Sequence, residues 1–158
     1  YKTLYLLDKD ENSLTNLNSF TAPYNEIDLA TLNGLTHLEN LSLKGNDLSD
    51  ITPLAGLTNL TTLELGSNNI SDLSPLTGLT NLTGTFGLNL RFNNISNLSP
   101  LAELTNLTWI DLGYNSVNDL TPLAGLTDLT ELYLNKNPIT DSQKAMLEEA
   151  LPSTSISW

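Results

Sequence analysis

Leucine recurs along this chain in a fixed order with polar residues, and the order is repeated several times. Each repeat contains the pattern L-x-x-L-x-L-x-x-N-x-I/L, for instance at Leu60, Leu63, Leu65, Asn68 and Ile70. Successive repeats start 21, 22, 22, 25 and 22 residues apart, and the first copy is the loosest. Repeats one to six begin at Leu14, Leu35, Leu57, Leu79, Leu104 and Leu126. Such regular copies predict units that stack and share one apolar interior.

The centre of each repeat, L-x-L, alternates apolar and polar residues. It therefore predicts a short strand whose leucines face inward. Strands of stacked repeats would pair in parallel about 4.8 Å apart and form a concave sheet. A period of about 20 to 29 residues with this motif is typical of the leucine-rich repeat. The expected fold is an α/β solenoid of right-handed leucine-rich repeats, with a concave parallel β-sheet and a C-terminal helical cap.

The second half of each repeat predicts a brief 3₁₀ or α turn on the convex side. The residue before each proline would be the N-cap of that turn, and these residues are Thr52, Ser74, Ser99 and Thr121. The asparagines of the motif can satisfy backbone groups where the chain leaves the sheet, so we interpret them as structural. They are Asn25, Asn46, Asn68, Asn93, Asn115 and Asn137.

The C-terminal end predicts a cover for the last repeat, which would otherwise expose its leucines. Thr140 and Gln143 fit a capping box, with Thr140 as the N-cap and Gln143 reaching back to it. The pattern from Asp141 to about Ala150 is helical. Pro152 ends the helix, and the alternation at 156–158 predicts a last edge strand.

The N-terminal end is less regular. Residues 3–7 read as a strand that either caps the first repeat or remains from an earlier one. We expect residues 1–158 to form a single leucine-rich repeat domain. Its expected parts are an N-terminal strand or cap at 1–13, six repeats at 14–139 and a C-terminal cap at 140–158.

Charge limits the classes of partner. The chain has 18 Asp and Glu residues against 6 Lys and Arg, a formal net charge of −12 at pH 7. This surface repels phosphate groups, so nucleic acid is not expected as a partner, whereas a basic patch on a protein would be attracted. No apolar run approaches the roughly 20 residues that span a bilayer, and the opening residues lack signal-peptide features. We expect no membrane insertion, and a monomer is the favoured state.

The titratable residues do not form a recognisable catalytic motif. His37 is the only histidine and has no constellation near it, and Glu148 and Glu149 fall on the cap helix. One Asp or Asn precedes each convex turn, but the column lacks the dense oxygen cluster of a calcium loop. These residues are Asp50, Asp72, Asn97 and Asp119. With no cysteine either, we expect no enzyme activity, no cofactor and no metal.

Two regular columns of threonine suggest a different function, namely binding to ice or to a crystalline polymer. The first column is Thr36, Thr58, Thr80, Thr105 and Thr127. The second is Thr61, Thr83, Thr108 and Thr130. The columns are three residues apart, so they cannot lie side by side on one strand face. They favour the turn leading into the strand, and ice or polymer binding is the less favoured alternative.

Repeats such as LTNLTTLELGSNNISDLSPLTG, Leu57 to Gly78, resemble the internalin-type repeats of bacterial surface proteins. The resemblance runs from Leu14 to about Asn137, and the tail ITDSQKAMLEEALPSTSISW resembles a bacterial end cap of such arrays. It implies a secreted or cell-surface module that binds a partner protein on its concave face. The helical N-terminal cap and wall-anchoring tail of internalins are not found in this sequence. Similar repeats also occur in cytosolic regulators of phosphatases, so a cytoplasmic regulatory scaffold is the alternative.

The outward strand positions differ between the first and last three repeats, and the difference predicts where a partner binds. Repeats four to six carry Trp, Tyr and Arg, the side chains most enriched in binding hot spots. The predicted partner-binding residues are Glu64, Phe86, Arg91, Phe92, Trp109, Asp111, Tyr114, Glu131 and Tyr133. A structural interpretation also fits, in which the aromatic rings lie on their neighbours and Arg91 pairs with Asp111.

Repeat four contains the only internal insertion, Thr83-Gly84-Thr85-Phe86-Gly87, three residues more than its siblings have. The flanking glycines permit a tight bulge at the edge of the sheet. Two placements suit Phe86 at the tip: packed back onto the core, or presented to a partner.

Overall fold

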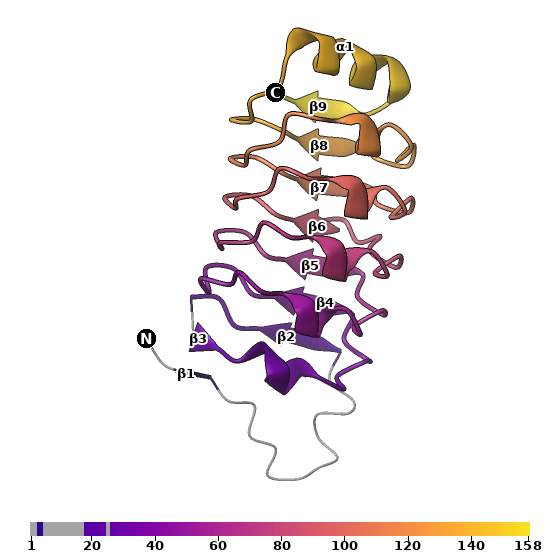
Figure 1. The fold of residues 1–158 in the computed structure, drawn as a ribbon. Helices are drawn as coiled ribbons and strands as arrows, with labels where there is room; N and C mark the ends of the chain where they lie inside the picture. The colour runs from indigo at the N-terminus through magenta and orange to yellow at the C-terminus, as the bar shows by residue number, and fades with distance from the viewer. Residues whose placement is uncertain (1–2, 5–17, 25) are drawn as a thin grey trace.

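Seven parallel strands form one sheet along the array of repeats (Figure 1). The computed structural model describes residues 3–4, 18–24 and 26–158. In this part of the chain the sheet order is β2-β4-β5-β6-β7-β8-β9. The strands are β2 Ser19–Thr21, β4 Asn40–Ser42, β5 Thr62–Glu64, β6 Leu88–Asn89, β7 Trp109–Asp111, β8 Glu131–Tyr133 and β9 Ser155–Ser157. With the 3₁₀ turns and the C-terminal helix described below, this sheet confirms the predicted leucine-rich repeat solenoid.

A second, two-stranded sheet lies at the N-terminal end of the array (Figure 1). β1 (Thr3–Leu4) pairs in parallel with β3 (Glu26–Ile27). The rest of the predicted N-terminal strand, residues 5–7, lies outside the described residues. The same holds for the start of repeat one at Leu14 and for Asn25.

The strands pair so that each inward side chain stacks on its equivalent in the next repeat. Leu63 pairs with Leu88, Leu88 with Ile110, and Ile110 with Leu132. All four are completely buried. The register therefore passes through repeat four unchanged, although that repeat has three additional residues. Full burial of one such side chain contributes about 1.5–3 kcal/mol to the stability of the fold. The inward strand positions are therefore apolar in all repeats.

Short 3₁₀ helices stack on one another in a second column along the array (Figure 1). They are η1 Leu29–Leu32, η2 Thr52–Leu54, η3 Ser74–Leu76, η4 Ser99–Leu101 and η5 Thr121–Leu123. In η2 to η5 the predicted N-caps are wrong by one position, because the Thr or Ser is already the first residue of the helix and its side chain does not cap. Those four residues are Thr52, Ser74, Ser99 and Thr121.

The column of Asp and Asn before each helix takes the capping role instead. Asp72 Oδ1 accepts the backbone N–H of Ser74 at 2.8 Å, and Asp72 Oδ2 accepts its hydroxyl at 2.8 Å. Both bonds favour the charged carboxylate and hold the pKa of Asp72 below its ordinary value of 3.8, the backbone bond more strongly than the hydroxyl bond. Equivalent backbone bonds of 2.9 to 3.0 Å are made by Asp50, Asn97 and Asp119. This column of Asp and Asn residues on the convex side thus has a structural function.

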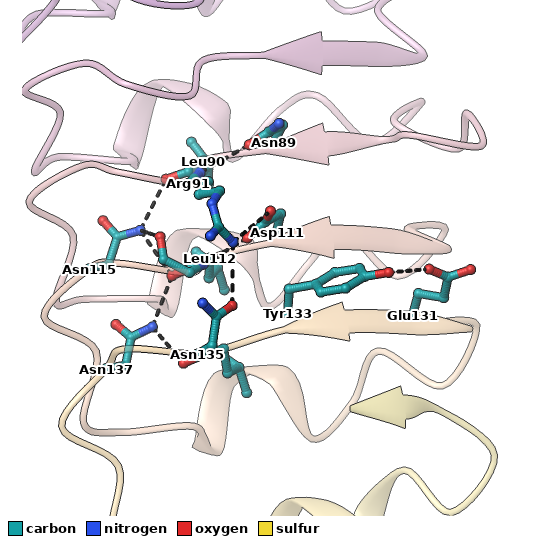
Figure 2. A network of polar contacts seen from close by, with 12 residues as sticks. Asn89, Leu90, Arg91, Asp111, Leu112, Asn115, Glu131, Tyr133, Asn135 and Asn137 are labelled. Atoms are coloured by element: carbon teal, nitrogen blue, oxygen red, sulfur yellow. Dashed lines mark hydrogen bonds and ion pairs between the residues drawn. The ribbon is translucent and has the colours of Figure 1, made fainter. Parts of the chain in front are cut away.

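The asparagines of the motif join consecutive repeats, as predicted. Asn68 Nδ2 donates to the carbonyl of Leu65 in its own repeat at 2.9 Å and to that of Leu43 in the preceding repeat at 3.1 Å. Its Oδ1 accepts the N–H groups of Asn46 and Leu48 at 2.9 and 3.0 Å. Donor bonds to both repeats recur at Asn93, Asn115 and Asn137 (the last two in Figure 2).

The C-terminal cap consists of α1 (Asp141–Ala150), which has the predicted bounds, and of β9. Leu147 and Leu151 are buried, so α1 covers the last repeat. The N-cap Thr140 accepts the N–H of Gln143 at 3.3 Å through its hydroxyl, as predicted. No helix in the described part of the chain is long and apolar enough to cross a membrane.

The other half of the predicted capping box is wrong. Gln143 Oε1 accepts the N–H of Leu120 at 2.7 Å instead of reaching back to Thr140. The physical reason is that α1 packs against η5, so that Gln143 meets a partly buried N–H of the repeat below. Such a group is costly to leave unpaired, whereas the N–H of an exposed N-cap can bond to water.

Candidate functional site

The outer face of the sheet has a polar half and an aromatic half. In repeats one to three its strands carry Ser, Thr, Asn and Glu, whereas in repeats four to six Trp, Tyr and Arg appear. The aromatic side chains form two groups. We define the aromatic row as Phe86, Trp109 and Tyr133. We define the arginine cluster as Arg91, Phe92, Asp111, Tyr114 and Asn135.

The aromatic row crosses repeats four to six. The ring centroids of Phe86 and Trp109 are 5.8 Å apart and meet edge to face at 81°. Those of Trp109 and Tyr133 are 5.6 Å apart at 49°. Phe86 is 66% exposed, so it lies on the surface and packs on Trp109 rather than on the leucine core. Pairs with this geometry contribute about 0.5–1.5 kcal/mol each, which holds the rings in place before anything binds.

Two glycines bring Phe86 onto this face. A Cβ atom on Gly84 would collide with Thr62 Oγ1 in the neighbouring repeat. A Cβ on Gly87 would lie 3.2 Å from the carbonyl oxygen of Trp109 and 3.2 Å from a methyl carbon of Leu107. The insertion can therefore lie close against the sheet only because both residues lack a side chain.

Tyr133 is tied to the first residue of its own strand. Its hydroxyl donates to Glu131 Oε2 at 2.7 Å (Figure 2). This bond to a carboxylate is the main cause that raises the pKa of Tyr133 above its ordinary value of 10.0. Tyr133 thus keeps its proton at neutral pH and offers a flat ring with a fixed hydroxyl, while Glu131 stays exposed beside it.

The arginine cluster lies beside the aromatic row. Arg91 extends across two repeats, with Nη1 3.6 Å from Asp111 Oδ2 and 3.4 Å from Asn135 Oδ1 (Figure 2). Its guanidinium carbon is 4.9 Å from the ring centroid of Phe92 and 4.7 Å from that of Tyr114. The pairing of Arg91 with Asp111, one of the two interpretations of the sequence, is therefore present.

Space for the guanidinium comes from a missing side chain. A Cβ atom on Gly113 would lie 2.9 Å from Arg91 Nη1 and 2.8 Å from Asn135 Oδ1. Asp111 is buried and also accepts the N–H of Gly113 at 2.8 Å. The cluster is thus a fitted arrangement, and its arginine is held rather than free to rotate.

The two rings of the cluster occupy a strained backbone position. Phe92 and Tyr114 have φ angles of +56° and +57°, and their rings stack with centroids 4.2 Å apart. The residue before each motif asparagine is left-handed throughout the described repeats, with Tyr24, Gly45 and Ser67 at this position in repeats one to three. For a residue with a side chain this conformation costs roughly 1–2 kcal/mol. The chain thus carries aromatic rings where glycine would fold more easily.

Glu64 is the one predicted site residue that comes from the polar half. It is half-buried and accepts the hydroxyl of Ser42 at 2.8 Å. Together with residues of the aromatic half it lines a pocket of about 440 Å³. The lining residues are Thr62, Glu64, Phe86, Asn89, Trp109 and Asp111. The structure thus gathers the nine predicted residues around two neighbouring groups, with Glu64 and Glu131 at their edges.

Three residues of this surface were missed from the sequence: Asn89, Gly113 and Asn135. Asn89 lines the pocket and accepts the N–H of Arg91 through Oδ1 at 3.0 Å. Gly113 and Asn135 shape the seat of Arg91. A glycine at an outward strand position is the signal that could have revealed them, because it has no packing purpose unless something lies over it.

Other titratable and threonine positions have their own surroundings. His37 lines a polar groove in which Glu39 is the only other titratable residue. Within the described residues, no group of three or more His, Cys, Asp or Glu side chains could hold a metal ion. In the second threonine column, Thr61 and Thr130 donate through their hydroxyls to carbonyls of the preceding repeat at 3.0 and 2.9 Å. Their hydroxyl protons are thus used within the fold.

Comparisons with known proteins support the leucine-rich repeat fold. Residues 36–78 and 105–145 match the family described as Leucine Rich repeats (2 copies). No curated protein gives a significant match. Among solved structures, internalin C2 from Listeria monocytogenes matches 90% of this chain with 43% identity and a TM-score of 0.83. Internalin F from the same organism matches 91% with 34% identity and a TM-score of 0.84.

The matched proteins are longer than this chain, which covers 61% of the internalin C2 chain and 42% of the internalin F chain. A leucine-rich repeat protein from Leptospira interrogans, LIC12759, matches 92% of this chain with 27% identity and a TM-score of 0.83, and 38% of that protein is covered. The two matches to Listeria internalins show that the repeats of this chain are of the internalin type.

Proposed function

Because the chain belongs to the leucine-rich repeat family and has internalin-type repeats, we propose that it is a non-catalytic protein-binding module. Its partner docks on the aromatic half of the sheet face, across the aromatic row and the arginine cluster. We further propose that it serves adhesion or recognition as a bacterial surface or secreted protein. The likeness to the Listeria internalins supports this role.

The observation that carries the proposal is the preorganisation of the aromatic half. Trp109 and Tyr133 are partly exposed yet fixed by ring contacts, and Arg91 is held by Asp111 and Asn135. Side chains that are already ordered lose little conformational entropy when a partner binds. Trp, Tyr and Arg are also the residues that most often carry binding energy. The polar half has the same rigid sheet without these anchors.

A binding screen with matched variants tests the proposal. Wild type, a Trp109→Ala/Tyr133→Ala variant and a Ser19→Ala/Asn40→Ala control would be measured against a panel of purified cell-surface proteins. For a partner found with wild type, Trp109→Ala and Tyr133→Ala should each weaken binding by about 2 kcal/mol, the hot-spot scale. This corresponds to roughly 30-fold in Kd. Asn40 is a better control than Ser42, because the Ser42 hydroxyl is bonded to Glu64.

The variants should fold as wild type does, since outward positions carry little of the packing. Partners that bind the aromatic-row variant as tightly as wild type would contradict the proposed site. An equal loss in the Ser19→Ala/Asn40→Ala control would contradict the division between the halves. Melting curves of each variant exclude the trivial cause, a lost fold.

The competing role is that of a cytosolic regulatory scaffold, which would use the same surface. Cell fractionation separates the two. Recovery of the protein in the medium or on the cell surface supports adhesion or recognition, whereas recovery in the cytosolic fraction supports the scaffold.

A further inference from the structure

A pocket lies at the boundary between the two halves, next to the insertion of repeat four. Leu63 pairs with Leu88 and Leu88 with Ile110, so Gly87 occupies the position that Thr62 and Trp109 have in the adjacent repeats. The insertion places Phe86 beside Trp109. Both rings line a pocket of about 440 Å³.

Two walls of the pocket are aromatic. Phe86 and Trp109 meet at 81°, so the rings stand nearly at a right angle and neither covers the other. Phe86 is 66% exposed. The remaining lining is polar, with the carboxylates of Glu64 and Asp111 and the amide of Asn89. An apolar corner next to carboxylates suits a ligand with an apolar stem and a positive end.

The two carboxylates of the pocket differ in whether they are already paired with a cation. Asp111 is buried and is already bonded to Arg91 and to the N–H of Gly113. Glu64 is half-buried and accepts a neutral hydroxyl from Ser42. The ion pair found in the described residues is that of Arg91 with Asp111, which leaves the charge of Glu64 without a cation. Glu64 is therefore the negative charge at this pocket that a ligand can neutralise.

Building on the protein-binding role proposed above, we propose that this pocket receives an arginine or lysine side chain of the partner protein. The charged end pairs with Glu64, and the stem or guanidinium plane packs against Phe86 and Trp109. Cation–π contact with Trp and a carboxylate partner are the features that recognise such side chains. The net charge of −12 favours a basic partner at longer range.

A pair of blocked tripeptides tests the charge requirement directly. Acetyl-Gly-Arg-Gly-amide is titrated into the ¹⁵N-labelled protein and compared with the citrulline peptide, which has nearly the same shape and no charge. The arginine peptide should shift the indole N–H of Trp109 and the backbone N–H of Phe86, and the citrulline peptide should bind at least about tenfold more weakly. Trp158→Phe assigns the indole signal, since the chain has two tryptophans.

Matched variants locate the charge. Glu64→Gln should weaken the arginine peptide about tenfold, whereas Glu103→Gln removes the same charge from the exposed surface near η4 and should leave it within about twofold. Trp109→Ala removes the indole signal itself, and in this variant the shift of the Phe86 backbone N–H should disappear. Equal binding of the arginine and citrulline peptides, or equal effects of Glu64→Gln and Glu103→Gln, would overturn the inference. So would a neutral trisaccharide that shifts these signals while the arginine peptide does not.

The two proposals can fail separately. If a protein partner depends on Trp109 and Tyr133 but the arginine peptide shows no binding, the protein-binding site stands and the basic-residue pocket is wrong. If the arginine peptide binds through Glu64 but no partner depends on the aromatic row, the pocket stands and the proposed docking surface is wrong.

Discussion

In repeat two the outward strand residues are Asn40 and Ser42, and in repeat five the equivalent positions are Trp109 and Asp111. The first pair is bonded lightly, through the hydroxyl of Ser42 to Glu64. The second pair joins the aromatic row and the arginine cluster. Both repeats have the same strand length and the same place in the parallel sheet. Strand formation thus does not dictate the outward residues, and selection for another purpose can act on them.

The interiors of the same two repeats hardly differ. Leu41 and Ile110 are both essentially inaccessible to solvent. Asn46 and Asn115 each donate to the carbonyl three residues earlier, at 2.9 and 3.0 Å. A repeat is therefore a fixed interior with an exchangeable outer surface. Changes to the interior should be costly wherever they are made, and changes to the outer face should matter only where it is specialised.

The largest effect should follow from removing the cover of the shared interior. Deletion of residues 141–158 removes the buried Leu147 and Leu151 and exposes the leucines of repeat six. The two side chains alone represent roughly 3–6 kcal/mol, which corresponds to a melting temperature at least about 10 °C lower, and aggregation should follow. Thermal unfolding followed by circular dichroism measures this. An unchanged melting curve would show that the last repeat needs no cover.

The next largest effect should come from one buried asparagine. Asn68→Ala removes the acceptor of two backbone N–H groups and the donor to two main carbonyl partners. Unpaired buried groups cost about 1–3 kcal/mol each, so the variant should lose about 3 kcal/mol or more in urea unfolding. Asn69→Ala is the matched control, because Asn69 is exposed and its side chain makes one bond of 3.5 Å. A similar loss in Asn115→Ala would confirm that both halves share one interior.

A smaller effect is expected from the left-handed backbone position before the motif asparagine. Phe92→Gly and Phe92→Ala both lose the stack on Tyr114, but only glycine relieves the φ of +56°. The Gly variant should therefore be about 1 kcal/mol more stable than the Ala variant. In the polar half, Ser67→Gly should stabilise the chain by about the same amount, because no ring is lost. A Phe92→Ala variant that is more stable than Phe92→Gly would contradict the claim that the backbone at position 92 is strained.

The smallest effect concerns pH and the convex caps, which both halves share. The pKa of Asp72 is lower in the folded chain than its ordinary value of 3.8. Its stabilising contribution is therefore complete above that ordinary value and is lost as the pH falls through the lower folded value. Asp72→Asn keeps the acceptor, as Asn97 shows, without the titration. As the pH is lowered from 7 to 3, the melting temperature of wild type should therefore fall relative to that of Asp72→Asn. A constant difference would contradict this account.

The pattern of leucines was enough to predict the architecture. An inward residue cannot change without leaving a cavity, so the L-x-L alternation identified the strands and placed Trp109 and Tyr133 on the outer face. Helix α1 was equally readable because Thr140 and the apolar residues that follow are local signals. These predictions depend on contacts that every repeat makes, and the repetition made them visible.

Features that depend on a single neighbour could not be predicted. The partner of Gln143 was wrong because the N–H of Leu120, far away in sequence, competes with the local one. The cap register was wrong because proline suits both the first and the second position of a short helix. The stack of Phe92 on Tyr114 requires a left-handed backbone, for which Gly45 in the same column was the only visible sign.

Strand β1, near the start of the chain, and the C-terminal strand β9 lie toward opposite ends of the array (Figure 1), which has a mechanical consequence. A force that pulls these two ends apart acts along the axis of the stack and loads the contacts between neighbouring repeats in series, so that they yield one at a time. Extension should then proceed in steps, each releasing one repeat of 22 residues and roughly 70–80 Å of chain. Repeat four holds 25 residues. Its step is longer by roughly 10 Å. This longer step would identify repeat four in a force–extension curve.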